Sequence, residues 1–191
     1  STFKGYDNVG AIAGTNNGTI DNVTTLGNTV EALGSANSAE LDGKNVGAAG
    51  GVVGTNTGTV NNATSRDSVI AGQDGENNPS GALTTAGGIA GINTGLVSNS
   101  QSHSAVTASK TSTYSLGGIV GVNTAKDNTT DNEITAGLDN VNAYGVTSGI
   151  YSETGNQAYA TSSNIGGIAG VNSGTLHDAY NESIVKGSSN V

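Results

Sequence analysis

Short apolar segments alternate along this chain with stretches of Gly, Asn, Thr and Ser, and one apolar phrase is written five times. Each copy combines glycines with an aliphatic pair such as Ile-Ala or Val-Val and closes on Asn. The copies occupy residues 9–16, 50–56, 87–93, 117–123 and 166–172. Their closing asparagines are 40, 37, 30 and 49 residues apart (56−16, 93−56, 123−93, 172−123). Because the phrase is constant while the spacing varies, we predict a repeated unit joined by loops of variable length.

Two further segments follow each phrase and complete the unit. The second follows a glycine turn, as at Gly18 and Gly95, and in the fourth copy it resumes at Gly137 after an insertion over residues 125–136. The third segments are centred on Val30, Val69 with Ile70, Val106, Val146 and Val185. Three short β segments with glycine at the first corner are typical of one coil of a solenoid, although two thinner coils per repeat fit the same pattern.

The repeats therefore predict an all-β fold, a right-handed parallel β-helix (β-solenoid) of about five coils. The chain would be a single domain over residues 1–191, with coils starting near residues 9, 50, 87, 117 and 166. Coils stacked about 4.8 Å apart pair backbone to backbone and share one core, and parallel crossovers are almost always right-handed.

Equivalent residues of successive coils should lie over one another and form rows along the solenoid axis. We expect one asparagine ladder of Asn16, Asn56, Asn93, Asn123 and Asn172. A second ladder should consist of Asn22, Asn62, Asn99, Asn140 and Asp178. The expected aliphatic core row is Ile12, Val52, Ile89, Ile119 and Ile168.

Both side-chain parities of the repeated phrase are apolar or small, so one wall of the solenoid should present an apolar outer face. With the core row inside, the outward row and lateral interface would be Ala13, Val53, Ala90, Val120 and Ala169. Two kinds of cover fit this face: a neighbouring subunit, or loops of the same chain, for which residues 31–48 and 148–164 are long enough.

Composition narrows the function classes. The 191 residues contain no Cys, Met or Trp, which excludes disulfides, thiolate nucleophiles and cysteine metal sites. The net charge is −9 with six Lys and Arg, which argues against nucleic acid and anionic membranes as partners. The sequence contains no run of 18 apolar residues, so it predicts no insertion into a membrane. The chain begins with Ser1, without a signal-peptide pattern, and reads as a processed or excised piece; we expect an extracellular or cell-surface location.

Candidate chemistry is sparse, and we predict no catalytic residues, no cofactor and no enzyme activity. His103 and His177 are the two histidines, without cysteines beside them, and we interpret them as surface or ladder residues. A weak calcium candidate is formed by Asp127, Asp131 and Glu133 of the fourth-copy insertion, although EF-hand spacing and glycine are missing and a solvated loop fits as well.

Paired carboxylates at neighbouring coils would favour a carbohydrate-active enzyme, which is a third function class for such folds. Asp21 and Asp139 occupy equivalent positions, but in coils one and four they would lie roughly 14 Å apart along the axis. The sequence therefore predicts no acid pair for glycoside hydrolysis.

The unit Gly-Gly-Ile-Ala-Gly-Ile-Asn-Thr-Gly-Leu-Val-Ser-Asn, residues 87–99, resembles the GLUG repeat. That repeat occurs in bacterial surface adhesins, filamentous-haemagglutinin-like proteins and some IgA-cleaving peptidases. All five copies are similar to it, and the first has Val9-Gly10 in place of Gly-Gly. The resemblance implies a secreted or surface-anchored β-solenoid that forms a stalk, adhesin or scaffold, and it specifies no activity.

We expect a structural subunit whose partners are other copies of itself. The chain spans close to an integral number of coils, and joining its tail to its head would make a return loop of ordinary length. End-to-end stacking would then give an extracellular filament, because a head-to-tail contact does not close. The alternative is a fragment of an adhesin that binds glycans or host surfaces through its loops.

Overall fold

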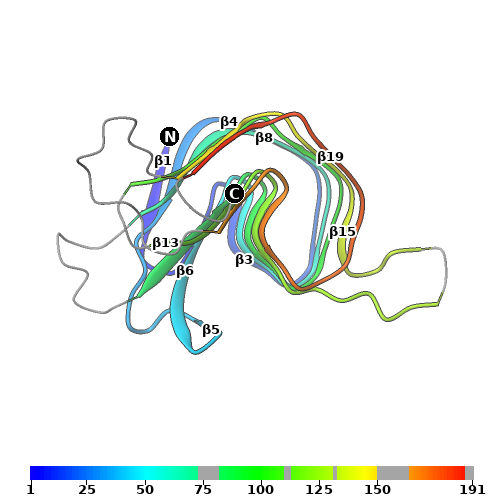
Figure 1. The fold of residues 1–191 in the computed structure, drawn as a ribbon, viewed down its shortest axis with the longest axis horizontal. Coiled ribbons are helices and arrows are strands. Elements are labelled where there is room, and N and C mark those ends of the chain that lie inside the picture. The colour runs from blue at the N-terminus through cyan, green and yellow to red at the C-terminus, as the bar shows by residue number, and fades with distance from the viewer. Residues whose placement is uncertain (73–81, 110–112, 131–132, 150–163, 188–191) are drawn as a thin grey trace.

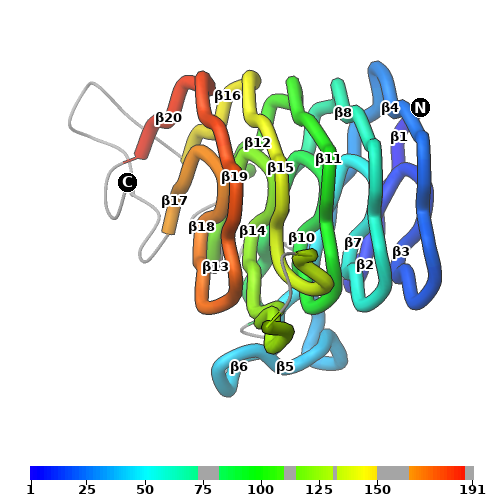
Figure 2. Tube along the Cα trace, turned by 90° about the vertical axis from the view of Figure 1, so that its right-hand side faces the viewer, coloured from blue at the N-terminus to red at the C-terminus, as the bar shows by residue number. Residues whose placement is uncertain are grey.

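The computed structural model of the protein describes residues 1–72, 82–109, 113–130, 133–149 and 164–187. The chain forms an all-β parallel solenoid, which confirms the predicted fold class (Figure 1). Among the described residues, every strand pair is parallel except β5 with β6. The coils are stacked in chain order from the N-terminal to the C-terminal end (Figure 2).

Each coil contributes strands to three sheets. β1 (Thr2–Gly5) pairs with the second half of β4 and is the last segment of a partial coil that precedes the first; the first coil contains β2 (Asn8–Gly10), β3 (Ala13–Asn16) and β4 (Thr19–Ala32). The second contains β5 (Glu40–Leu41), β6 (Lys44–Gly50), β7 (Val53–Asn56) and β8 (Thr59–Ala71). The third contains β9 (Leu83–Gly87), β10 (Ala90–Asn93), β11 (Leu96–Ser102) and β12 (Ala105–Ala108). The fourth contains β13 (Thr113–Gly117), β14 (Val120–Asn123), β15 (Gly137–Ala143) and β16 (Val146–Ser148), and the fifth contains β17 (Asn164–Gly166), β18 (Ala169–Asn172), β19 (Leu176–Asn181) and β20 (Ile184–Lys186).

The strand order fixes the number of turns. The first sheet contains β1, β4, β8 and the pairs β11/β12, β15/β16 and β19/β20; the second has the order β18-β14-β10-β7-β3, and the third β17-β13-β9-β6-β2. Five stacked strands in the third sheet enclose four complete turns, and β18 to β20 continue into a fifth coil, so the coil count differs slightly from the predicted five. Asn16 pairs with Asn56 and Asn56 with Asn93, so one repeat makes one coil and the alternative of two thinner coils is wrong.

The glycines of each phrase produce a sharp bend between the third and second sheets. Figure 1 shows the chain folding back between β6 and the β3 wall, with the tip pointing toward the arc of β4, β8 and β15. A Cβ atom on Gly50 would overlap the carbonyl oxygen of Val53, and one on Gly51 would overlap the hydroxyl of Ser65 in the first sheet. Only glycine permits this close approach.

This bend explains why one sequence prediction is wrong. Val52 and Val53 are both fully buried in one cluster, although neighbouring residues of a straight strand point to opposite faces. The row predicted as an outward lateral interface therefore lies in the core: Val53, Ala90 and Val120 are fully buried, and Ala13 and Ala169 of the end coils pack partly against the same cluster. The core row behaves as predicted in the middle coils, where Val52, Ile89 and Ile119 are fully buried, whereas Ile168 is partly buried and Ile12 is 49 % exposed.

A different row of the same wall, which includes Ile92 and Val122, faces outward, and the chain itself covers at least part of it. Ile92 and Val122 are buried in a cluster with Ala48 of β6, and Leu41 of β5 packs against this cluster. The paired residues of the β5–β6 hairpin, 40–45, lie within residues 31–48, one of the two segments expected as a cover. Residues 150–163 of the other segment lie outside the described residues.

Candidate functional site

The first asparagine ladder runs through the solenoid as predicted. The Nδ2 atom of each asparagine donates to the Oδ1 atom of the next: Asn16 to Asn56 at 2.9 Å, Asn56 to Asn93 at 2.8 Å, Asn93 to Asn123 at 3.0 Å and Asn123 to Asn172 at 2.8 Å. The Nδ2 atoms of Asn16, Asn56 and Asn93 also donate to the carbonyl of the glycine two residues on, which holds the corner of the coil. The ladder therefore satisfies buried amides and fixes the register of the coils.

The second ladder is only partly continuous. Its five members all have a left-handed backbone with φ between 46° and 55°, a conformation that Asn and Asp tolerate better than other non-glycine residues. Asn62 donates to Asn22 at 3.1 Å and Asn140 to Asn99 at 2.8 Å, but Asn99 donates to Asn61 instead of Asn62. At the fifth coil Asp178 lies against a histidine, so the amide ladder ends there.

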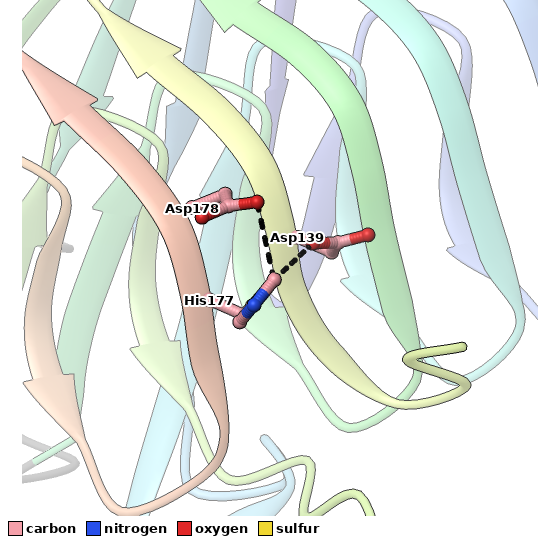
Figure 3. Close-up of side chains that lie close together, drawn as sticks. All are labelled: Asp139, His177 and Asp178. Atoms are coloured by element: carbon pink, nitrogen blue, oxygen red, sulfur yellow. Dashed lines mark hydrogen bonds and ion pairs between the residues drawn. The ribbon is translucent and has the colours of Figure 1, made fainter. Parts of the chain in front are cut away.

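Asp139, His177 and Asp178 form a cluster at the C-terminal end of the solenoid (Figure 3). The Nδ1 atom of His177 lies 2.8 Å from Asp139 Oδ1 and 3.5 Å from Asp178 Oδ2. One potential ligand atom from each residue lies within 4.8 Å of the other two. The hydrogen bond to Asp139 and the charge of Asp178 raise the pKa of His177 above its usual value. An imidazole and two carboxylates in this arrangement have the chemistry to hold a proton or a metal cation.

This cluster was missed at the sequence level, although a signal for it exists. Asp139 precedes Asn140 as His177 precedes Asp178, and Asn140 and Asp178 belong to the same expected ladder. The strand register pairs Asp139 with His177 directly across β15 and β19. Aligning the second segments of coils four and five would have placed the three side chains together.

The other histidine has a different environment. The ring of His103 stacks on the ring of Tyr144, with ring centroids 4.9 Å apart. The ring centroids of Tyr144 and Tyr180 are 6.2 Å apart. Burial, followed by the positive charge of Arg66, lowers the pKa of His103 below its usual value. His103 is therefore part of an aromatic row along the coils, in keeping with its interpretation as a ladder residue.

The calcium candidate in the fourth-copy insertion uses its carboxylate within its own loop. Asp127 accepts hydrogen bonds from the hydroxyls of Thr129 and Thr135, at 2.9 Å to each. Desolvation raises the pKa of Asp127, but these hydrogen bonds outweigh it, and the pKa is lowered. Glu133 is exposed, and Asp131 lies outside the described residues. Asp127 therefore holds the loop closed, and the calcium site stays a prediction because one of its three carboxylates lies outside the described residues.

Both end coils expose side chains that belong to core columns. Leu176 continues the column of Val60, Val97 and Leu138, which are fully buried, yet Leu176 is 43 % exposed. At the other end Ile12, in the column of Val52, is 49 % exposed. Every residue of β19 is exposed. In the part of the chain that the structure describes, both ends are thus strand edges flanked by accessible apolar surface, a combination that favours pairing with another chain.

No helix capable of spanning a bilayer occurs in the described part of the chain. No family model matches the sequence, and neither a curated protein nor a solved structure matches it.

Proposed function

We propose that the protein is a non-catalytic structural subunit that stacks head to tail into an extracellular or cell-surface filament. The observation that carries this proposal is the pair of open end coils, whose strand edges and core columns are accessible at both ends of the described solenoid. Main-chain pairing of β17, β18 and β19 of one copy with β2, β3 and the first half of β4 of the next would continue the three sheets, whereas the second half of β4 is already paired with β1.

The repeat supplies a specific register for this contact. The first ladder always donates from one coil to the next, so Asn172 Nδ2 would donate to Asn16 Oδ1 of the next copy, as Asn123 does to Asn172. The same register would place Leu176 beside Ile20 of the next copy and bury the exposed end of that column. A contact between two different ends of the molecule does not close on itself and yields a fibre.

The extracellular location and the relation to GLUG-repeat proteins belong to this proposal as well. The resemblance to GLUG-repeat surface proteins, the acidic charge and the absence of cysteine favour an extracellular scaffold. The alternative of an adhesin that binds glycans through its loops is decided by the same experiment.

Negative-stain electron microscopy and sedimentation velocity over a range of protein concentrations test this proposal. We expect unbranched fibres in the wild type and their loss in Leu176→Lys, because a charge would then lie at the joint. Ala105→Lys is the matched control, since Ala105 is exposed on the side of the third coil and fibres should persist. A wild-type chain that stays monomeric at high concentration overturns the stacking proposal and favours the adhesin, to be tested on a glycan array.

A further inference from the structure

The cluster of Asp139, His177 and Asp178 is not needed for the coil itself. The other coils have Asn62, Asn99 or Asn140 at the position of Asp178, and these amides serve as neutral ladder groups. We propose that Asp139, His177 and Asp178 form a binding site for a divalent transition-metal ion of the Zn²⁺ class.

The donor set fits this class of ion. One imidazole nitrogen with two carboxylates suits Zn²⁺, whereas Ca²⁺ and Mg²⁺ prefer oxygen ligands alone. Bonds of about 2.0 to 2.2 Å place neighbouring ligand atoms of a tetrahedral zinc ion roughly 3.3 Å apart. The His177 Nδ1 atom lies 2.8 and 3.5 Å from oxygens of Asp139 and Asp178, both close to this spacing, and ligand atoms of all three residues lie within 4.8 Å of one another. The two carboxylates also balance the charge of the ion.

The backbone positions the three ligands before an ion arrives. Asp139 and His177 are paired residues of β15 and β19, so the distance between their backbones is fixed by the sheet. Asp178 has a φ of 46°, in the left-handed conformation shared by its ladder. Its side chain therefore does not follow the regular alternation of side chains along the strand. Figure 3 shows the three side chains meeting on the outer side of the sheet.

In the stack proposed above, on which this step rests, a second copy would add a ligand. The register that pairs Asp139 with His177 continues through Ser98 and Asn61 to Asp21 of the first coil. Asp21 of the next copy would therefore lie beside His177, opposite Asp139. The ion would then bridge two subunits and couple filament growth to the metal.

Isothermal titration calorimetry with zinc chloride tests the site on the full chain, at a concentration where sedimentation shows monomers. We expect one saturable site in the wild type and a loss of affinity of at least about tenfold in His177→Ala and in Asp139→Asn. His103→Ala is the matched control, because it removes the other histidine and should leave the affinity unchanged. Circular dichroism checks that each variant is folded. Absence of saturable zinc binding, or equal affinity in the wild type and His177→Ala, overturns the site.

Sedimentation with and without zinc separates this site from the stacking proposal. If the chain never assembles, stacking fails while the calorimetry still decides the site; if fibres form without zinc binding, the site fails and stacking stands. Zinc should increase assembly of the wild type but not of Asp21→Asn, and an equal increase in both overturns the bridging role of Asp21.

Discussion

Replacement of Thr147 by valine should stabilise the protein. Thr147 occupies a core column along the third segments, where the register pairs it with Val106 on one side and Val185 on the other. Further along the column are Val30 and Val69, both fully buried. Thr147 is itself fully buried, and its Oγ1 atom has no hydrogen-bond partner among the described residues. A single hydroxyl therefore interrupts a column of valines.

The expected magnitude follows from the hydroxyl alone. A buried polar group without a partner costs about 1 to 3 kcal/mol relative to water. Valine has nearly the shape of threonine and replaces the hydroxyl with a methyl group that neighbouring valines already accommodate in the next coil. We expect Thr147→Val to raise the free energy of unfolding by about 1 kcal/mol, near the lower end of that range because the site has a partly buried neighbour, Val185.

Urea denaturation followed by circular dichroism measures this change as a higher midpoint at an unchanged m-value. Val106→Thr is the matched control: it makes the reverse substitution one coil away and should lower stability by about 1 to 3 kcal/mol. A lower midpoint for Thr147→Val would refute the reasoning, because it would show that the hydroxyl makes a stabilising hydrogen bond.

Three further predictions concern the ladder, the bend and the histidine. Asn93→Ala should lower the free energy of unfolding by about 3 kcal/mol in urea denaturation, because Asn93 is fully buried and its amide links three coils; a loss below about 1 kcal/mol would contradict a stabilising ladder. Gly91→Ala should destabilise by about 1 to 3 kcal/mol, because the new Cβ atom would lie 2.8 Å from that of Ala48, whereas Gly18→Ala has open space and should change little; equal effects would argue against the close approach. In metal-free buffer, NMR titration should give His177 a pKa above 6.5, so its stabilising effect is complete below the unfolded-state pKa and is lost as the pH rises through the higher folded-state pKa; a value at or below 6.5 would disprove the pairing with the aspartates.

Much of the fold could be predicted from the sequence because the chain repeats itself. Residues at the same place in each copy must have the same environment, so a conserved spacing within the phrase translates directly into rows along the axis. The ladder from Asn16 to Asn172 and the buried core row of the middle coils followed from alignment of the copies alone. The end coils departed from this rule, because Ile12 has no coil beyond it among the described residues.

The sequence by itself determined the parallel solenoid and its ladders, whereas the tertiary structure decided which side chains face inward and which residues become neighbours. Alternation of side chains holds only in a straight strand, and the bend at Gly50 and Gly51 turned Val53 into the core instead of outward. Register decided the third segment of coil four, where Thr147 and not Val146 continues the valine column. Register also brought His177 against Asp139, because pairing between coils depends on where each loop returns the chain to the sheet, and variable loops leave no local pattern for that position.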